Sequence, residues 1–273
     1  DACQQVAHGM DTVLAMIGIL PTIRDKDLCL ANMSAMKRFD VLNAQVLQQR
    51  GGAPIHIDIE GADQLHLSRP DVMLEAATTS FQLHLQVPYE KAGRYYNASL
   101  LSCAPLLAAA VNSPLLFGQR LWQETRVPLF EQAVELGGYG GLAETTVRRV
   151  TFGRGYVASS PLELFEENLE HYPVLLPIPQ AEPATRFPHL RLHNGAIWRW
   201  VRPLIGFDGA GQGHVRLEQR VLPSGPTVLD MVANAALYYG LVHVLARQPQ
   251  AAEAGLSFAD TRANFSAAAR NGL

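Results

Sequence analysis

Three charged residues alternate along one short stretch toward the C-terminal end of the sequence. In GHVRLEQRVLPSGPTVLD, residues 213–230, Arg216, Glu218 and Arg220 occupy every second position. Because successive side chains of a strand point to opposite faces, these charges are expected on one face of a sheet. A carboxylate there could hold a divalent cation while guanidinium groups bind phosphate oxygens, a combination that phosphoryl transfer uses. The alternative is a surface strand on which Glu218 merely neutralises two arginines.

A histidine lies on the polar face of a second expected strand. In FQLHLQV, residues 81–87, apolar side chains alternate with Gln82, His84 and Gln86. A lone strand histidine is usually a hydrogen-bonded structural residue, but two polar-faced strands together favour a shared polar cavity. Glu75, nine positions before His84, is a weaker candidate of the same kind. The alternation in PIHIDIEG, residues 54–61, is explained well enough by a solvated strand face.

Two further stretches carry residues whose role the spacing leaves open. Arg126 in FGQRLWQETRVPLF, residues 117–130, is either a charge on a helix face or a ligand for an anionic group. HNGAIWRWVRP, residues 193–203, offers Asn194, Trp198 and Arg202. Trp198 could pack in the core with Trp200, or it could form a wall against which a purine or a substrate stacks.

Composition and missing motifs exclude several classes of protein. The 273 residues have a formal net charge of -3, without the basic surplus that a nucleic-acid backbone would favour. No GxSxG, HExxH or GK[ST] motif occurs. Three separated cysteines without a CxxC pair predict free thiols in a reducing cytoplasm. No signal peptide is visible, and prolines within the uncharged residues 97–118 favour a buried helix over a membrane span.

The remaining patterns predict an α+β fold. Helices are expected over residues 31–50, 90–111, 119–136, 160–171 and 227–246, and strands over 54–61, 81–87, 190–203 and 214–222. The glycine-rich residues 137–146 are expected to form a mobile loop. Because the elements show neither regular βαβ alternation nor a repeat, we expect an antiparallel sheet with helices packed on one face.

Two runs resemble glutamate-cysteine ligase family 2, the bacterial carboxylate-amine ligases. They are R-x-E-x-R-x-x-P-x-G-P-T at residues 216–227 and N-G-x-I-W at residues 194–198. SFQLHLQV and AAAVNSPLLFG add to the resemblance, which spans most of the chain. It implies a glutamine-synthetase-like fold, in which an antiparallel sheet forms a funnel that holds ATP and divalent metals, with helices packed on its outer face.

The resemblance also implies a metal site. His84 and Glu218 match residues that bind one magnesium ion, with Mn²⁺ as an alternative, and Glu75 is a further candidate ligand. The family opens with a strand carrying a Glu-x-Glu pair, and no such strand precedes DACQQVAHGMD. Either that strand lies upstream of Asp1 or the protein lacks a complete metal site. Because the sequence does not begin with Met, we expect the first, with residues 1–273 as a single catalytic domain whose acidic strand lies upstream and whose C-terminal tail lies downstream.

The remaining matched residues are implied to bind the nucleotide and the substrate. Arg216 would contact the nucleotide phosphates, and Arg220 would contact phosphate or an acyl-phosphate intermediate. Arg126, which follows the NSP block, would bind a carboxylate or phosphate during catalysis. Asn194 and Trp198 are expected beside the nucleotide.

The implied reaction is ATP-dependent formation of an amide, of the γ-glutamyl type, through an acyl phosphate. It needs no protein nucleophile, which agrees with the missing motifs. The expected substrates are small carboxylates and amines, amino acids among them. Neither nucleic acid nor a membrane is expected as a partner. A homo-oligomer is left open. Two alternatives are a non-catalytic relative that binds nucleotide or amino acid, and another phosphotransferase such as a guanidino kinase. Glu218→Gln is expected to abolish metal-dependent activity and to leave the fold intact.

Overall fold

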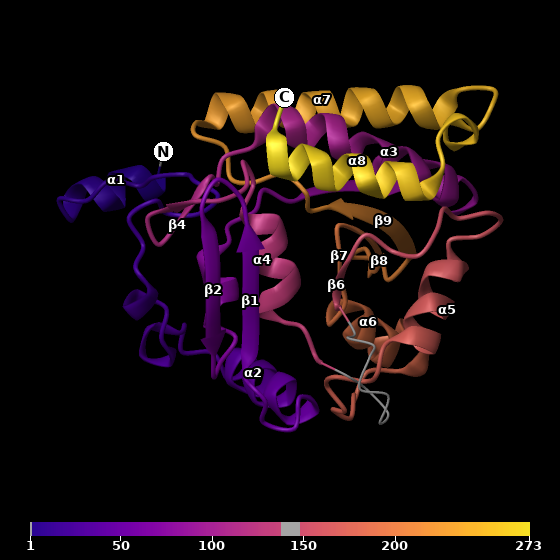
Figure 1. Ribbon diagram of the computed structural model, residues 1–273. Coiled ribbons are helices and arrows are strands. Elements are labelled where there is room, and N and C mark those ends of the chain that lie inside the picture. The colour runs from indigo at the N-terminus through magenta and orange to yellow at the C-terminus, as the bar shows by residue number, and fades with distance from the viewer. Residues whose placement is uncertain (1, 138–147) are drawn as a thin grey trace.

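Figure 1 shows the computed structural model, which describes residues 2–137 and 148–273. The predicted glycine-rich loop at 137–146 lies, apart from Gly137, outside the described residues. The strands are β1 (Ile55–Glu60), β2 (Gln64–Arg69), β3 (Leu83–Val87), β4 (Leu115–Leu116), β5 (Gln119–Arg120), β6 (Val150–Thr151), β7 (Trp198–Arg199), β8 (Val201–Phe207) and β9 (Gly213–Gln219). The α-helices are α1 (Ala2–Gly9), α2 (Lys37–Gln49), α3 (Ala92–Ala110), α4 (Arg126–Ala133), α5 (Leu162–His171), α6 (Pro188–Gly195), α7 (Val228–Arg247) and α8 (Phe258–Asn271). This mixture of helices with strand pairs that are antiparallel except for β6–β7 agrees with the α+β class.

The sheet that carries the predicted site has three described strands in the order β3-β9-β8, all antiparallel. A tight turn joins β8 to β9, because the Asp208 carboxylate accepts hydrogen bonds from the backbone N–H groups of Ala210 and Gln212. The turn fixes the β8–β9 register, which places Glu218 of β9 opposite Arg202 of β8. On the other side of β9, the pairing with β3 places Glu218 opposite His84. The funnel itself stays a prediction, since three strands do not define one.

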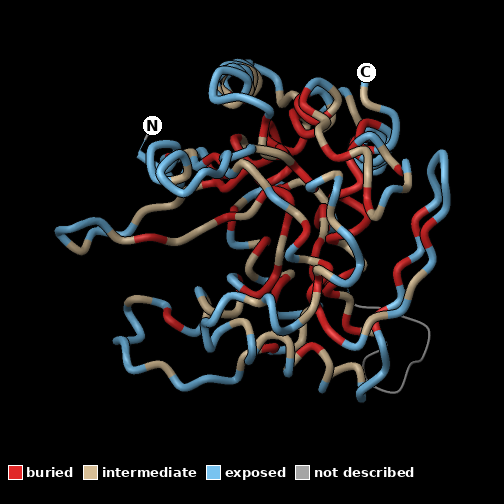
Figure 2. The backbone as a smooth tube through the Cα atoms, turned by 90° about the vertical axis from the view of Figure 1, so that its left-hand side faces the viewer, coloured by how far each residue is buried: buried red, intermediate tan, exposed pale blue. Residues whose placement is uncertain are grey.

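Three helices lie side by side over one side of this sheet, with α3 between α7 and α8 (Figures 1 and 2). The side chains of α3 are mostly buried, and contact between Gln219 of β9 and Cys103 of α3 joins it to the sheet. Helix α7 also contacts the sheet, because the Tyr239 hydroxyl donates a hydrogen bond to the His84 carbonyl oxygen at 3.1 Å.

A second, two-stranded sheet stands apart from the first, as the β1–β2 hairpin beside α4 in Figure 1. Along β1 the isoleucines are buried and the polar residues exposed in strict alternation, so the predicted solvated strand face is confirmed. Helix α2 ends before Gly51 and Gly52, whose φ angles of 63° and 79° are readily adopted only by glycine.

Three predicted elements are wrong in part. The helix expected over residues 31–50 begins only at Lys37. Residues 119–136 form a helix only from Arg126, because Gly118 (φ 79°) turns the chain into the short β4–β5 hairpin. The predicted strand at 190–203 begins as helix α6, which starts with Pro188 in the first turn, and becomes extended only at Trp198. Short apolar runs fit either periodicity, so alternation alone misassigned residues 190–195.

Candidate active site

One face of the β3–β9–β8 sheet gathers the predicted polar side chains. Residues His84, Glu218 and Arg202 form a row across the three strands, and Arg216 lies two positions along β9 on the same face. The predicted proximity of His84 and Glu218 is confirmed, because His84 Nε2 lies 3.5 Å from Glu218 Oε1. Their function as ligands stays a prediction.

The Glu218 carboxylate is held by two arginines through a single oxygen. Arg202 donates from Nε to Oε2 at 2.8 Å, and Arg220 donates from Nη1 to the same oxygen at 3.0 Å. The Glu218 side chain is only 5% exposed, and burial alone would raise its pKa. The charges of Arg202 and Arg220 outweigh burial and hold the pKa below its ordinary value, so Glu218 is a carboxylate at neutral pH.

The other oxygen of Glu218, Oε1, faces neutral groups. The Gln82 amide lies between Glu218 and Arg220, placed to donate to Oε1 at 3.1 Å and to accept from Arg220 Nη1 at 2.9 Å. On the His84 side, burial lowers the pKa of the imidazole, and the nearby arginines oppose the effect of Glu218. At neutral pH the ring is therefore uncharged, and the 3.5 Å approach of His84 to Glu218 is not an ion pair.

Arg216 has the fewest partners of the charged groups on this face. Its side chain has no salt bridge among the described residues, and its buried Nε has no hydrogen-bond partner there. With Asn194 and Arg191 of α6 it lines a cavity of about 210 Å³. Asn194 is fixed in that wall because it donates to the Pro203 carbonyl at 2.8 Å and accepts from Asn168 at 2.9 Å. A cation with unused donors at a cavity is suited to bind an anion.

The predicted metal ligands do not form a complete cage. Glu75 lies on the 3-10 turn Met73–Ala77 and lines a different cavity, of about 290 Å³. Burial raises the Glu75 pKa, and Arg220 opposes that rise. In residues 2–137 and 148–273, no three histidine, cysteine, aspartate or glutamate side chains are grouped to hold an ion. His84 Nε2 and Glu218 Oε1 nevertheless fit as two ligands, and Mg²⁺ is commonly bound by few protein groups together with phosphate oxygens and water.

The two predicted catalytic arginines have different surroundings. Arg220 is the residue directly after the end of β9, and its guanidinium lies at the site because it donates a hydrogen bond to the Glu218 carboxylate. Arg126 is 2% exposed, and its Nε donates to the buried Glu124 at 2.9 Å. Its other nitrogens donate to the carbonyl oxygens of Arg220 and Val221. Burial lowers the Arg126 pKa, an effect that Glu124 opposes. These contacts tie α4 to the end of β9, and a role of Arg126 toward substrate stays a prediction.

Trp198 has aromatic neighbours rather than a place on the polar sheet face. Its ring lies 6.2 Å from that of Phe130, which also contacts Trp200 at 6.0 Å. Trp200 is 1% exposed and packs against Phe265, so the core interpretation holds for it. Trp198 is half-buried, and its predicted place beside a nucleotide stays a prediction.

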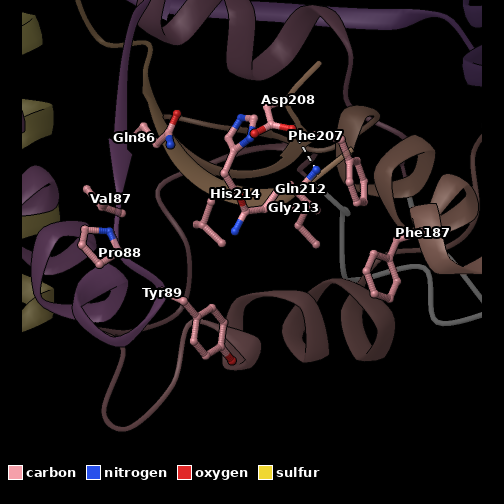
Figure 3. Close-up of a pocket in the computed structure, with 12 residues that line it drawn as sticks. Gln86, Val87, Pro88, Tyr89, Phe187, Phe207, Asp208, Gln212, Gly213 and His214 are labelled. Atoms are coloured by element: carbon pink, nitrogen blue, oxygen red, sulfur yellow. Dashed lines mark hydrogen bonds between the residues drawn. The ribbon is translucent and has the colours of Figure 1, made fainter. Parts of the chain in front are cut away.

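A larger cavity of about 740 Å³ adjoins the same sheet face at the β8–β9 turn (Figure 3). His214 of β9 and Gln86 of β3 line this cavity. Arg216 is their neighbour on the sheet, because it lies opposite Gln86 and two positions after His214. Its other described lining residues are mainly apolar or aromatic: Val87, Pro88, Tyr89, Phe187, Ile205, Phe207, Asp208, Gln212, Gly213 and Val215. The Asp208 carboxylate is occupied by the turn. Since no described lysine or arginine lines the cavity, its chemistry suits an uncharged planar group.

The sequence patterns missed two contributors to this arrangement. Arg202 was visible as a polar residue, but only the β8–β9 register shows that it pairs with Glu218. Gly206 lies opposite His214, and a Cβ at Gly206 would fall 2.5 Å from His214 Nε2. The glycine therefore makes room for the imidazole ring. A glycine within a strand pattern is the signal that could have indicated this close approach.

Comparisons with known proteins give one strong similarity. No curated protein and no solved structure matches the chain. A family model, described as glutamate-cysteine ligase family 2, matches residues 7–273, which is nearly the whole chain. The protein therefore belongs to glutamate-cysteine ligase family 2.

Proposed function

We propose that the protein is an ATP-dependent carboxylate–amine ligase that forms an amide through an acyl phosphate. Membership of glutamate-cysteine ligase family 2 implies a carboxylate–amine ligase-like function. The observation that carries the finer proposal is the pairing of a neutral His84 with an ionised Glu218, next to an arginine with unused donors. These groups together suit a cation-bound, negatively charged phosphate chain.

The order of the side chains along β9 suggests how the nucleotide would lie in the site. His214, Arg216 and Glu218 follow one another on one face, and four residues of strand span roughly 13 Å at about 3.3 Å per residue. In the proposal, the 740 Å³ cavity at His214 holds the uncharged base. Arg216 then binds the phosphates, and the terminal phosphate lies near Glu218 and His84. Amino-acid substrates would approach from the Arg220 end of the strand.

The proposed reaction has two steps. A substrate carboxylate oxygen attacks the terminal phosphorus of ATP, and the bond to ADP breaks. The amine nitrogen then attacks the acyl-phosphate carbon, phosphate leaves, and the amine loses a proton. A magnesium ion held by His84 and Glu218 would neutralise phosphate charge. Arg216 would hold the phosphates in place, and Arg220 would bind the transferred group while it positions Glu218.

A non-catalytic relative that binds nucleotide or an amino acid is the second candidate. Two observations favour it: the described residues supply no third metal ligand, and both arginines beside Glu218 are already paired with its carboxylate. Such a protein would bind the nucleotide without turning it over.

Titration calorimetry with MgATP and an ADP-release assay test both candidates. The full-length protein is assayed with pairs of amino acids, with Mg²⁺ and with Mn²⁺, and products are identified by mass spectrometry. Arg216→Gln is compared with Arg38→Gln, which removes an exposed arginine on α2. ADP release with an amide product, lost in Arg216→Gln only, supports the ligase. Binding without turnover supports the second candidate. A phosphorylated product without an amide indicates another phosphotransferase, and absence of binding contradicts both proposals.

A further inference from the structure

Helix α7 presents an apolar surface that no described residue covers. It lies at the top of Figure 1 and at one edge of the row of three helices, and the same helix at the top of Figure 2 is mostly exposed. From Met231 to Ala246 it carries no Asp, Glu, Lys or Arg. Among the described residues it is the one helix long and apolar enough to cross a membrane, yet only 11% of its most apolar window is buried. That fraction distinguishes it from the core helix of a soluble protein.

The two faces of α7 differ. On the inner face Tyr238 and Val242 are buried, and hydrogen bonds join Tyr238 to Ser99 and His243 to Tyr95 of α3, at 3.2 and 3.1 Å. The outer face repeats apolar residues at spacings of three and four: Leu229, Val232, Ala233, Ala236, Gly240 and Val244. All six are exposed, with Leu229 at 77% and Val244 at 62%. A monomeric soluble protein rarely exposes a continuous apolar stripe of this kind.

A lipid surface fits this stripe poorly. To span a bilayer, α7 would have to leave α3, to which hydrogen bonds and packing along its inner face join it. A helix that lies on a membrane usually carries several lysines or arginines beside its apolar face. Arg247 is the single Lys or Arg in α7. The stripe is therefore better suited to another protein surface of the same character.

We propose that the outer face of α7 packs antiparallel against α7 of a second copy of this chain. A two-fold axis between Ala236 and Leu237 would place Leu229 of one copy beside Val244 of the other. It would also place Ala233 beside Gly240. The stripe is thus self-complementary. The small residues Ala233, Ala236 and Gly240 at its centre let the two helix backbones approach, and the larger Leu229 and Val244 pack against each other at both ends.

The charges at the helix ends agree with this arrangement. Asp230 lies in the first turn and Arg247 in the last. In an antiparallel pair the first turn of one copy lies beside the last turn of the other, so opposite charges and opposite helix dipoles approach each other. A parallel pair would bring like charges together at both ends.

The available area suits a weak, reversible dimer. A helix of 20 residues is 30 Å long and about 10 Å across, so its outer half exposes roughly 500 Å². Two copies would bury at most about 1,000 Å², which is the lower limit for specific interfaces. The dimer is therefore expected to dissociate on dilution.

Cysteine cross-linking tests the geometry in the full-length protein, after the exposed and half-buried native thiols are removed by Cys3→Ser and Cys29→Ser. Ala236→Cys lies next to the proposed axis and should form a disulfide-linked dimer under mild oxidation. Ala233→Cys and Gly240→Cys should each form no disulfide-linked dimer when oxidised alone but should cross-link when mixed. Ala267→Cys, an exposed alanine of α8, is the matched control and should not cross-link. Cross-linking of Ala267→Cys as readily as Ala236→Cys, or none in the mixture, would overturn the proposal.

Sedimentation velocity over a hundredfold range of concentration provides the second measurement. The native protein should pass from monomer to dimer, whereas Ala236→Glu, which places two carboxylates at the axis, should stay monomeric with an unchanged circular dichroism spectrum. A native protein that is monomeric throughout contradicts the proposal. Flotation with phosphatidylcholine vesicles, reduced by Ala236→Glu, would then assign the stripe to lipid. An oligomer that Ala236→Glu leaves intact would place the interface elsewhere.

Discussion

Substitution of Glu218 by glutamine is expected to weaken the fold considerably. From the sequence alone, this change should leave the fold intact, but the contacts predict otherwise. Glu218 neutralises Arg202 and Arg220, whose side chains are only 12% and 11% exposed. Glutamine has the same shape and no charge, so two nearly buried cations would face each other without their shared counter-ion. Breaking a buried ion pair from one side typically costs about 3–5 kcal/mol.

That loss would be a large part of the total stability, which is about 5–15 kcal/mol for a natural protein. Urea unfolding followed by circular dichroism measures it, with Glu182→Gln as the control. Glu182 pairs with Arg191 at 3.3 Å on the surface, where both side chains are well exposed, and its loss should cost less than about 1 kcal/mol. The variants Arg202→Met and Arg202→Met with Glu218→Gln complete a double-mutant cycle, and a coupling energy of about 2 kcal/mol is expected.

A stability loss for Glu218→Gln no larger than that of Glu182→Gln would refute this reasoning. It would mean that water or rearrangement screens the two arginines and that Glu218 is not their necessary counter-ion. The measurement also affects assays of activity. Loss of turnover in Glu218→Gln is evidence for a ligand role only at temperatures where the variant is shown to be folded.

Three further outcomes follow from the site and its surroundings. The Glu163 carboxylate accepts hydrogen bonds from the backbone N–H groups of Ala158, Ser160 and Ser159, which lower its pKa from 4.5 to about 2. The stabilisation that the ionised Glu163 gives to the fold is therefore present above pH 4.5 and is lost as the pH falls toward 2. The difference in melting temperature between the native protein and Glu163→Gln should therefore shrink over that interval. Arg216→Gln should weaken ATP binding at least about tenfold in calorimetry, because a charged hydrogen bond is lost. Gly206→Ala should displace the His214 ring and weaken ATP binding, with a change in unfolding free energy below about 1 kcal/mol.

Strands β1, β3 and β9 and the helices α3 and α7 could be predicted from local patterns, whereas β2 and α8 were missed. The alternation of β1, β3 and β9 follows from one buried and one polar side, and Thr227 caps α7 by accepting from the Asp230 N–H. The predicted proximity of His84 and Glu218 needed one further step, the assumption that two polar-faced strands are neighbours.

The remainder depended on contacts between distant residues. No local pattern shows that Arg202 lies opposite Glu218, because the strand register is set by the turn at Asp208. Arg126 was expected to meet a ligand, but Glu124, two positions away, is buried with it and accepts its hydrogen bond. A sequence does not reveal whether an arginine's counter-charge lies in the protein or in a substrate.

The hydrogen bond from Tyr239 to the His84 carbonyl has a consequence for association. Strand β3 is at the margin of the three described strands, and such a margin offers free backbone groups to any passing extended chain. The phenol of Tyr239 occupies one of those groups, directly behind the imidazole. A strand that annealed there would first have to displace a side chain of α7. Helix α7 thus limits how a further strand can pair with β3 at His84.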